Sequence, residues 1–164
     1  MWNGIKYLLI AVVFEINPIV INADIIIDDS FGSPGVLQGP NFKITENLGR
    51  RDGTNLFHSF SEFSLHKGES ATFSAINKIE NVIGRVTGSE ISEIDGIINS
   101  NISGADLYLL NPNGFLFKEN AELNIDGAFV VSAMSKINLG ETGVFNAVDP
   151  QKSVFVTAPP DAFG

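Results

Sequence analysis

One short segment restricts the possible folds of this chain more than any other. Residues 107–110 are four consecutive large apolar side chains (LYLL), the turn sequence Asn111-Pro112-Asn113-Gly114 follows at once, and residues 115–117 (FLF) are apolar again. An apolar run of this length between turn residues is typical of a strand buried on both faces. The first Asn can bond to the backbone beyond it, Pro presets φ, and Gly tolerates the exit from the turn. The segment therefore predicts a buried strand that bends sharply into a second buried strand.

Short apolar runs separated by polar or glycine corners continue along the chain. Such serial strands fit an antiparallel sandwich or barrel, or a parallel β-helix whose coils stack on one another. Asparagines at strand ends favour the β-helix, because stacked amides can form ladders between coils. These asparagines are Asn99, Asn101, Asn111, Asn113, Asn120 and Asn124. The apolar runs after residue 96 are residues 97–98, 107–110, 115–117, 123 and 125, 129–131, 137 and 139, and 154–156.

The segments before residue 96 give more specific expectations. Residues 24–29 and 41–46 are predicted strands, separated by a Gly- and Pro-rich loop, and residues 47–53 are a predicted charged turn. Phe57, Phe60 and Phe63 are three residues apart, which would suit a helical turn, but the Asn, Ser and Gly around them favour a strand. Residues 75–83 place three isoleucines at helical spacing, so a single helical turn is expected before a strand at residues 82–87.

The N-terminus has the pattern of a signal peptide. Lys6 supplies a positive charge, residues 7–14 form an apolar core, and residues 21–23 (INA) end in a small residue. The apolar core is much shorter than the ~20 residues that a membrane-spanning helix needs. We therefore predict a signal peptide over residues 1–23, with cleavage between Ala23 and Asp24. The alternative is a buried first strand that runs from residue 19 through residue 27.

Composition narrows the functional classes. The 164 residues suffice for one domain with a core, and 44% hydrophobic against 18% charged residues argues against disorder. The net charge of −9 argues against a nucleic-acid-binding surface, which needs a basic patch. The chain has no cysteine, so burial rather than disulfide bonds must stabilise the fold.

No catalytic or metal-binding pattern emerges. Asp28 and Asp29 are adjacent and would point to opposite faces of a strand, and Asp95 and Asp106 lie at corners without an obvious partner. The only histidines are His58, interpreted as a hydrogen-bonded structural residue, and His66. They are too few for a metal site. The sequence also lacks a Gly-x-Ser-x-Gly elbow and a phosphate-binding loop. We therefore expect no enzyme activity, cofactor or metal.

Five blocks together carry a family resemblance. They are residues 55–63 (NLFHSFSEF), 82–88 (VIGRVTG), 94–98 (IDGII), the Asn-Pro-Asn-Gly turn, and 124–129 (NIDGAF). In order and spacing they resemble the N-terminal secretion domain of filamentous-haemagglutinin-like exoproteins, the exported partners of two-partner secretion systems. The match runs from about residue 24 to residue 164. Some members carry a second Asn-Pro-Asn-Leu block before the middle strand, where this chain has residues 74–81 (SAINKIEN).

The resemblance implies an all-β fold, a right-handed parallel β-helix with capping or extra-helical hairpins over residues 24–164. It also implies export through the periplasm and recognition by the periplasmic polypeptide-transport modules of an outer-membrane β-barrel transporter. The chain would cross the outer membrane unfolded, which suits the absence of cysteine, and then template downstream coils at the cell surface or as a secreted protein. Asn111, Pro112, Asn113 and Gly114 would be the recognition motif.

Further expectations follow for the partners. We expect a monomer without nucleic acid and without stable membrane insertion. The alternative function is a surface adhesin or carbohydrate-binding β-helix module, and a glycan-active enzyme ranks third.

Overall fold

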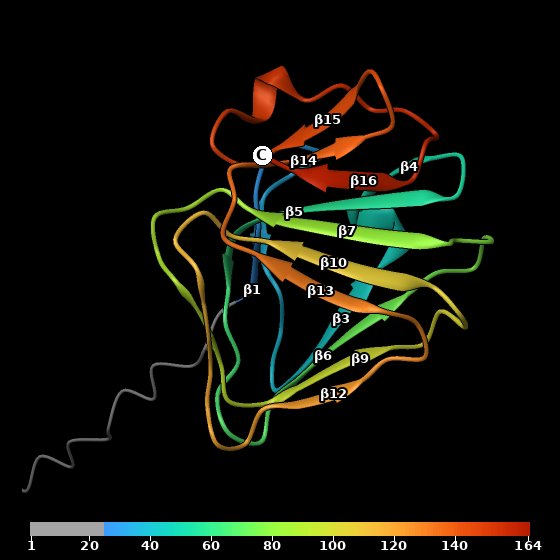
Figure 1. Ribbon diagram of the computed structural model, residues 1–164. Helices are drawn as coiled ribbons and strands as arrows, with labels where there is room; N and C mark the ends of the chain where they lie inside the picture. Colours follow the sequence, from blue (N-terminus) through green and yellow to red (C-terminus); the bar gives the residue numbers. More distant parts are fainter. Residues whose placement is uncertain (1–24) are drawn as a thin grey trace, which may run out of the picture.

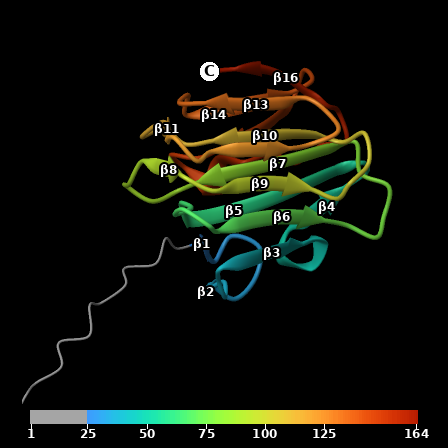
Figure 2. The same ribbon diagram turned by 90° about the horizontal axis from the view of Figure 1, so that it is seen from below.

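The computed structural model describes residues 25–164, so the predicted signal peptide, its cleavage site at Ala23 and Asp24, and residues 19–21 lie outside the described residues. The protein is all-β, with 49% strand and 4% helix, and its stacked parallel coils form a β-helix of about four turns. The prediction of a parallel β-helix is therefore confirmed. The coils lie one above another in Figure 2, and the cap formed by the last strands covers one side of the stack in Figure 1.

Each coil contributes strands to sheets that run along the stack. The largest sheet contains four parallel strands in the order β13-β10-β7-β5, followed by the antiparallel β1 and β2. A second sheet has the order β12-β9-β6-β3, and a third contains β11 and β8. The bounds are β1 (Ile25–Ile27), β2 (Gly35–Val36), β3 (Asn41–Thr45), β4 (Arg50–Asp52), β5 (Asn55–Phe63), β6 (Ser70–Ser74), β7 (Asn81–Val86), β8 (Ser92–Ile94), β9 (Ile97–Ser100), β10 (Asp106–Leu110), β11 (Phe115–Phe117), β12 (Glu122–Asn124) and β13 (Phe129–Ser132).

Aligned apolar side chains fill the interior of the coils. Leu56, Val82 and Leu107 are register partners in β5, β7 and β10, and all three are fully buried. The facing sheet contributes Phe42 and Ile44 from β3, as the alternating pattern of residues 41–46 predicts. Because each coil stacks the same kind of side chain on the coil below, the core is continuous along the stack.

A second apolar layer covers the outer face of the large sheet. It is formed by β14 (Lys136–Leu139), β15 (Gly143–Asn146) and β16 (Pro160–Phe163), which make an antiparallel sheet, with the 3-10 turn η2 (Pro150–Lys152). We call residues 133–164 the cap. Phe57 and Ile83, on the outer face, pack against Ile137, Leu139 and Phe145 of the cap. Strand β10 is therefore covered on both faces, as its sequence predicts.

The structure contradicts the expected burial of residues 115–117. Strand β11 follows the turn, but Leu116 and Phe117 are 46% and 40% exposed. The physical reason is that β11 pairs only with β8, and no described strand stacks on its other edge. The apolar sequence therefore predicted the strand correctly but not the exposure of its side chains.

Residues 75–83 contain no helical turn, which contradicts the second expectation. Ile76 is 98% exposed, whereas Ile79 is buried. Residues 76 and 77 are instead irregular, and their backbone N–H groups donate hydrogen bonds to the Glu46 carboxylate. Glu46 itself begins the 3-10 turn η1 (Glu46–Leu48), so the predicted charged turn at residues 47–53 is in fact η1 followed by β4.

The three phenylalanines of β5 belong to a strand, as predicted. Phe57 faces the cap, whereas Phe60 and Phe63 both face the interior. The register with β1 shifts because Ile26 pairs with Glu62 and Ile27 with Phe60, which leaves Ser61 as an extra residue. This bulge brings Phe60 and Phe63 to the same face. Within residues 25–164, no helix is long and apolar enough to cross a membrane.

Candidate recognition site

The Asn-Pro-Asn-Gly turn is closed by its own groups. The N–H of Gly114 donates to the carbonyl of Asn111 at 2.9 Å, and the N–H of Asn113 donates to the Asn111 side-chain Oδ1 at 2.9 Å. Gly114 has φ +99°, a left-handed conformation that only glycine adopts easily. The predicted roles of Asn111, which bonds to the backbone beyond it, and of Gly114 at the exit of the turn are therefore confirmed.

Both asparagines also tie the turn to the coil below. Asn111 is fully buried, and its Nδ2 donates to the carbonyl of Glu90 at 3.1 Å and to the hydroxyl of Ser92 at 3.0 Å. The Asn113 side chain is exposed, and its Nδ2 donates to the carbonyl of Gly88 at 2.8 Å. In the folded protein the Asn111 amide is thus inaccessible, whereas Asn113 lies at the surface.

An exposed apolar strand adjoins the turn. Strand β11 begins at Phe115, one residue after Gly114, and presents Leu116 and Phe117 to solvent. Among the described strands it pairs with β8 alone, so one row of its backbone groups is free. The site therefore combines a rigid polar turn with an edge strand that can accept a further strand.

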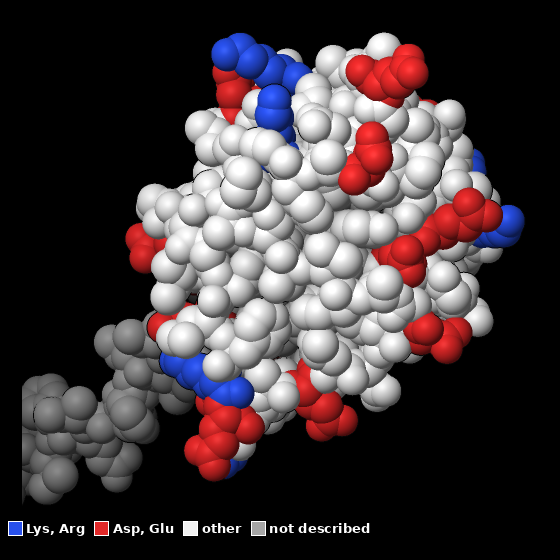
Figure 3. Space-filling view, in the orientation of Figure 1, with Lys and Arg blue, Asp and Glu red and all other residues white. Residues whose placement is uncertain are grey.

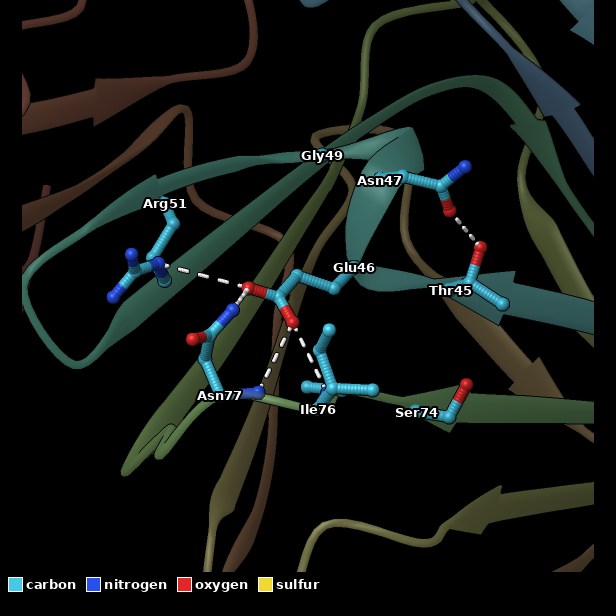
Figure 4. A pocket seen from close by; sticks show the side chains of 9 residues that line it. Thr45, Glu46, Asn47, Gly49, Arg51, Ser74, Ile76 and Asn77 are labelled. Carbon is cyan, nitrogen blue, oxygen red and sulfur yellow. Dashed lines mark hydrogen bonds and ion pairs between the residues drawn. The ribbon is translucent and has the colours of Figure 1, made fainter.

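A hollow lies at another corner of the β-helix, between η1 and the loop that follows β6 (Figure 4). Its volume is about 520 Å³. The Glu46 carboxylate lies within it and accepts hydrogen bonds from the loop: Ile76 N–H at 3.1 Å, Asn77 N–H at 3.2 Å and the Asn77 side-chain amide. It also pairs with Arg51 Nε of β4 at 3.6 Å. Burial would raise the pKa of Glu46, but the hydrogen bonds from Asn77 and Ile76 and the Arg51 charge together lower it.

The structure does not bring the acidic residues together. Asp28 is buried and accepts hydrogen bonds from Ser59 and Thr87, whereas its neighbour Asp29 is exposed. Asp95 accepts from the side chain of Asn120 at 2.8 Å, and Asp106 accepts from the backbone N–H of Ala128 at 2.8 Å. The two corner aspartates therefore do have partners, in the next coil. Residues 25–164 contain no group of three or more side chains that could hold a metal ion.

His58 is buried as a structural residue, but it is not hydrogen-bonded as expected. Its side chain is completely buried beside Phe60 and Phe73, and neither ring nitrogen has a hydrogen-bond partner among the described residues. Burial lowers its pKa to about 4, and the nearby Leu48 backbone offsets only part of this effect. Gly49 makes room for the ring, because a Cβ there would lie 2.9 Å from its Cε1 and Nδ1 atoms. His66 is exposed and does not approach this position.

The predicted asparagine ladders take another form. Asn99 and Asn124 are register partners in β9 and β12, so two of the named asparagines do stack on adjacent coils. The corner amides nevertheless bond to other groups: Asn99 to Thr72, Asn120 to Asp95, and Asn111 to Glu90 and Ser92. An amide-to-amide step between coils occurs instead at Asn55 and Asn81, where Nδ2 of Asn81 donates to Oδ1 of Asn55 at 2.9 Å. Both asparagines begin their strands rather than end them. An asparagine at the start of each strand was the sequence signal that could have revealed this pair.

Arg85 is a buried polar residue that the sequence analysis did not select. It is 1% exposed and lies in β7 between apolar neighbours. A single cation inside the apolar strand sequence VIGRV was the available signal.

Comparison with known proteins identifies the family. Residues 23–164 match the family described as the TPS secretion domain. The same comparisons found no match among curated proteins and none among solved structures. The matched residues include the whole β-helix, the Asn-Pro-Asn-Gly turn and the cap, and the chain therefore belongs to the TPS secretion domain family, the N-terminal domain of two-partner secretion proteins.

Proposed function

We propose that the periplasmic polypeptide-transport modules of an outer-membrane β-barrel transporter recognise this domain in extended form. We further propose that, after export, its last coil templates the coils that follow. Membership of the family indicates an exoprotein that passes through the periplasm and implies an outer-membrane transporter as partner, with a non-catalytic module at the N-terminus.

The free strand edges of the fourth coil support the proposed templating of further coils. Among the described strands, β12 pairs only with β9, and β13 pairs only with β10, so each has one free edge. Leu123 and Val131 on these strands are 46% and 37% exposed. In Figure 3 the charged side chains lie mainly around the rim of the face that shows β7, β10 and β13 in Figure 1, and other residues cover its middle. An apolar edge with free backbone groups supports the stacking of a further coil.

The turn supports the recognition step. Because Asn111 is buried and its amide is fully used in the folded domain, a transporter could read both asparagines only before folding. An extended segment can add a strand to the edge of a partner's sheet, with main-chain bonds for affinity and pockets for alternate side chains. The sequence from Leu107 to Phe117, two apolar runs around a polar turn, suits such a strand-adding segment.

Competition for export tests this function. The chain, produced in the periplasm of cells that secrete a full-length exoprotein through the matching transporter, should lower secretion of that exoprotein. The reason is that both chains would occupy the same periplasmic modules. Undiminished secretion, even when the chain is present in excess, would contradict the proposed recognition.

The alternative is a surface adhesin or carbohydrate-binding module, and the hollow of Figure 4 is its natural location. None of the hollow's lining residues is aromatic, so it lacks a stacking platform for a sugar ring. The Glu46 oxygens are already used by Asn77, Ile76 and Arg51. Binding of the purified domain to cells, without any effect on export, would favour this alternative.

A further inference from the structure

A small polar cavity lies where the cap meets strands β4 and β7. Its volume is about 160 Å³, roughly five water molecules at ~30 Å³ each. Two of the three arginines of the chain line it, together with two serine hydroxyls. The lining residues are Ser30, Phe31, Arg50, Arg85, Pro150, Gln151, Ser153 and Phe155.

Neither of these arginines has a carboxylate partner. The chain contains 19 acidic and only 10 basic residues, so most cations could find a partner at little cost. Arg51 does so, at 3.6 Å from Glu46. Among residues 25–164, however, no carboxylate oxygen lies within 4.0 Å of the guanidinium of Arg50 or Arg85. Unpaired positive charge is therefore concentrated at this cavity.

Arg85 is held rigidly at the cavity wall. Its Nε donates to Ser59 Oγ at 2.7 Å, Nη1 donates to the Asn146 carbonyl at 2.6 Å and Ser153 Oγ at 2.7 Å, and Nη2 donates to Ser30 Oγ at 3.0 Å. Burial lowers its pKa to about 10, and the Asp28 charge partly offsets this, so the group is a cation at neutral pH. Asp28 lies behind Ser59, to which it is bonded at 2.6 Å, and it neutralises Arg85 only from a distance.

Arg50 supplies the free donors. Its guanidinium carbon lies 4.1 Å from the centre of the Phe155 ring, which orients the side chain by a cation–π contact. Its side chain makes no hydrogen bond to the described residues, so its five N–H groups are free of protein acceptors. A planar guanidinium with free donors matches the geometry of a carboxylate or a phosphate.

We propose that this cavity binds a small oxyanion, a carboxylate or a phosphate group, between Arg50 and the wall formed by Arg85, Ser30 and Ser153. The cavity volume limits the ligand to a few heavy atoms or to one anionic group of a larger molecule. Since β4, β7 and the cap all contribute to the site, the bound anion would bridge them and stabilise the docked cap.

Calorimetry and thermal unfolding of the full chain test the site. Phosphate and citrate are titrated separately, against chloride at equal ionic strength, because chloride controls for general screening. Saturable binding in the millimolar range or tighter is expected for at least one of them, together with a rise in the thermal midpoint. Binding of phosphate alone would assign a phosphate ligand, and binding of citrate alone would assign a carboxylate.

Paired variants distinguish this site from general electrostatics. Arg50→Gln should weaken binding on the order of tenfold to a hundredfold, which corresponds to the loss of charge-assisted hydrogen bonds. Arg51→Gln removes the same charge from the opposite face of β4 and should leave the affinity unchanged. Gln151→Glu places a competing carboxylate at the cavity and should abolish binding while Arg50 remains.

Two results would overturn the proposal. One is the absence of saturable binding of either anion to the unaltered chain. The other is an equal loss of affinity in Arg50→Gln and Arg51→Gln, which would mean that only net charge matters. Both side chains are exposed, so the thermal midpoint without ligand verifies that each variant folds.

Discussion

Replacing Asn113 with alanine should separate the stability of the domain from its export. The change removes the Nδ2 donation to the Gly88 carbonyl at 2.8 Å and the weaker contact with Asn111 Oδ1 at 3.2 Å. The backbone N–H of residue 113 keeps its bond to Asn111. The lost bond lies at the surface, so the cost should be about 0.5–1.5 kcal/mol of unfolding free energy. A domain with a stability of about 5–15 kcal/mol stays folded after such a loss.

Asn111→Ala should be a harsher change. It removes three bonds at a fully buried position: the donations to Glu90 and Ser92, and the acceptor for the Asn113 N–H. It also removes the weaker contact with the Asn113 amide at 3.2 Å. At ~0.5–1.5 kcal/mol for each of the three stronger bonds, the loss is at least about 1.5–4.5 kcal/mol. This variant therefore confounds folding with recognition, and Asn113 is the better probe.

The matched control is Asn120→Ala. Asn120 is also a corner asparagine, and its Nδ2 bonds to Asp95 in the coil below at 2.8 Å, so its removal should cost about the same as removal of the Asn113 side chain. Leu109→Ala, at a core position that is 3% exposed, calibrates the effect of instability and should cost roughly 2–5 kcal/mol.

The assay compares the thermal midpoint of each purified variant with its secreted yield through the transporter. We expect Asn113→Ala to be secreted poorly and Asn120→Ala nearly normally, although their midpoints are similar. If the yields of all variants follow the midpoints, the turn is purely structural and the recognition role assigned to it is wrong.

Three further predictions concern pH, passage and processing. The pKa of His58 is about 4 in the folded protein and 6.5 ordinarily, so the folded state binds the His58 proton more weakly than the unfolded state does. The free energy of unfolding should therefore be highest above pH 6.5 and fall by up to about 3 kcal/mol as the pH decreases towards 4. Urea unfolding across this range should show the loss, and His58→Phe should flatten it; an unchanged slope would mean that the ring is solvated. Thr72→Cys with Asn99→Cys, register partners in β6 and β9, should block export under oxidising conditions and release it on reduction, whereas secretion of the cross-linked form would exclude unfolded passage. Mass spectrometry of exported material should find Asp24 at the N-terminus, and a retained Met1 would refute cleavage after Ala23.

The stacked coils could be predicted from sequence because their pattern is local. The apolar run at residues 107–110 and the turn after it need only the neighbouring residues to specify a buried strand and a corner. The same pattern failed at residues 115–117, because burial there depends on whether another coil stacks on β11. Sequence therefore identifies the strands well and their position in the stack poorly.

The polar contacts between residues far apart in the sequence could not be predicted in the same way. Glu46 controls the loop at residues 76–77 from 30 residues away, and no local spacing reveals this contact. The helical spacing of Ile76, Ile79 and Ile83 was misleading, since one of the three points into solvent. His58 was interpreted as a hydrogen-bonded structural residue, but whether its nitrogens find partners depends on the packing of Gly49 and Phe73 around it.

At the candidate site, too, the contacts within the turn could be predicted from the sequence, whereas its contacts with the coil below could not. The internal bonds of the Asn-Pro-Asn-Gly turn follow from turn chemistry, and they are present. The partners of its asparagines in the coil below, Gly88, Glu90 and Ser92, depend on coil length and register. The family resemblance implied capping hairpins, and β14 and β15 form one. The residue pattern alone showed only further apolar runs there, because an antiparallel hairpin and a coil strand have the same alternation.

The separation of contacts along the sequence implies an order of assembly. Bonds between neighbouring coils join residues about one coil apart, as in Asn55 to Asn81 and Ser59 to Arg85, each 26 residues apart. Contacts with the cap join residues that are much farther apart in the sequence. Arg85 and Asn146 are 61 residues apart, and Asn55 and Ala158 are 103 residues apart. Shorter loops close at lower entropic cost, so neighbouring coils can form one upon another before the cap docks. The cap covers the outer face of β5 and β7, and we infer that its docking is the last step that completes the domain.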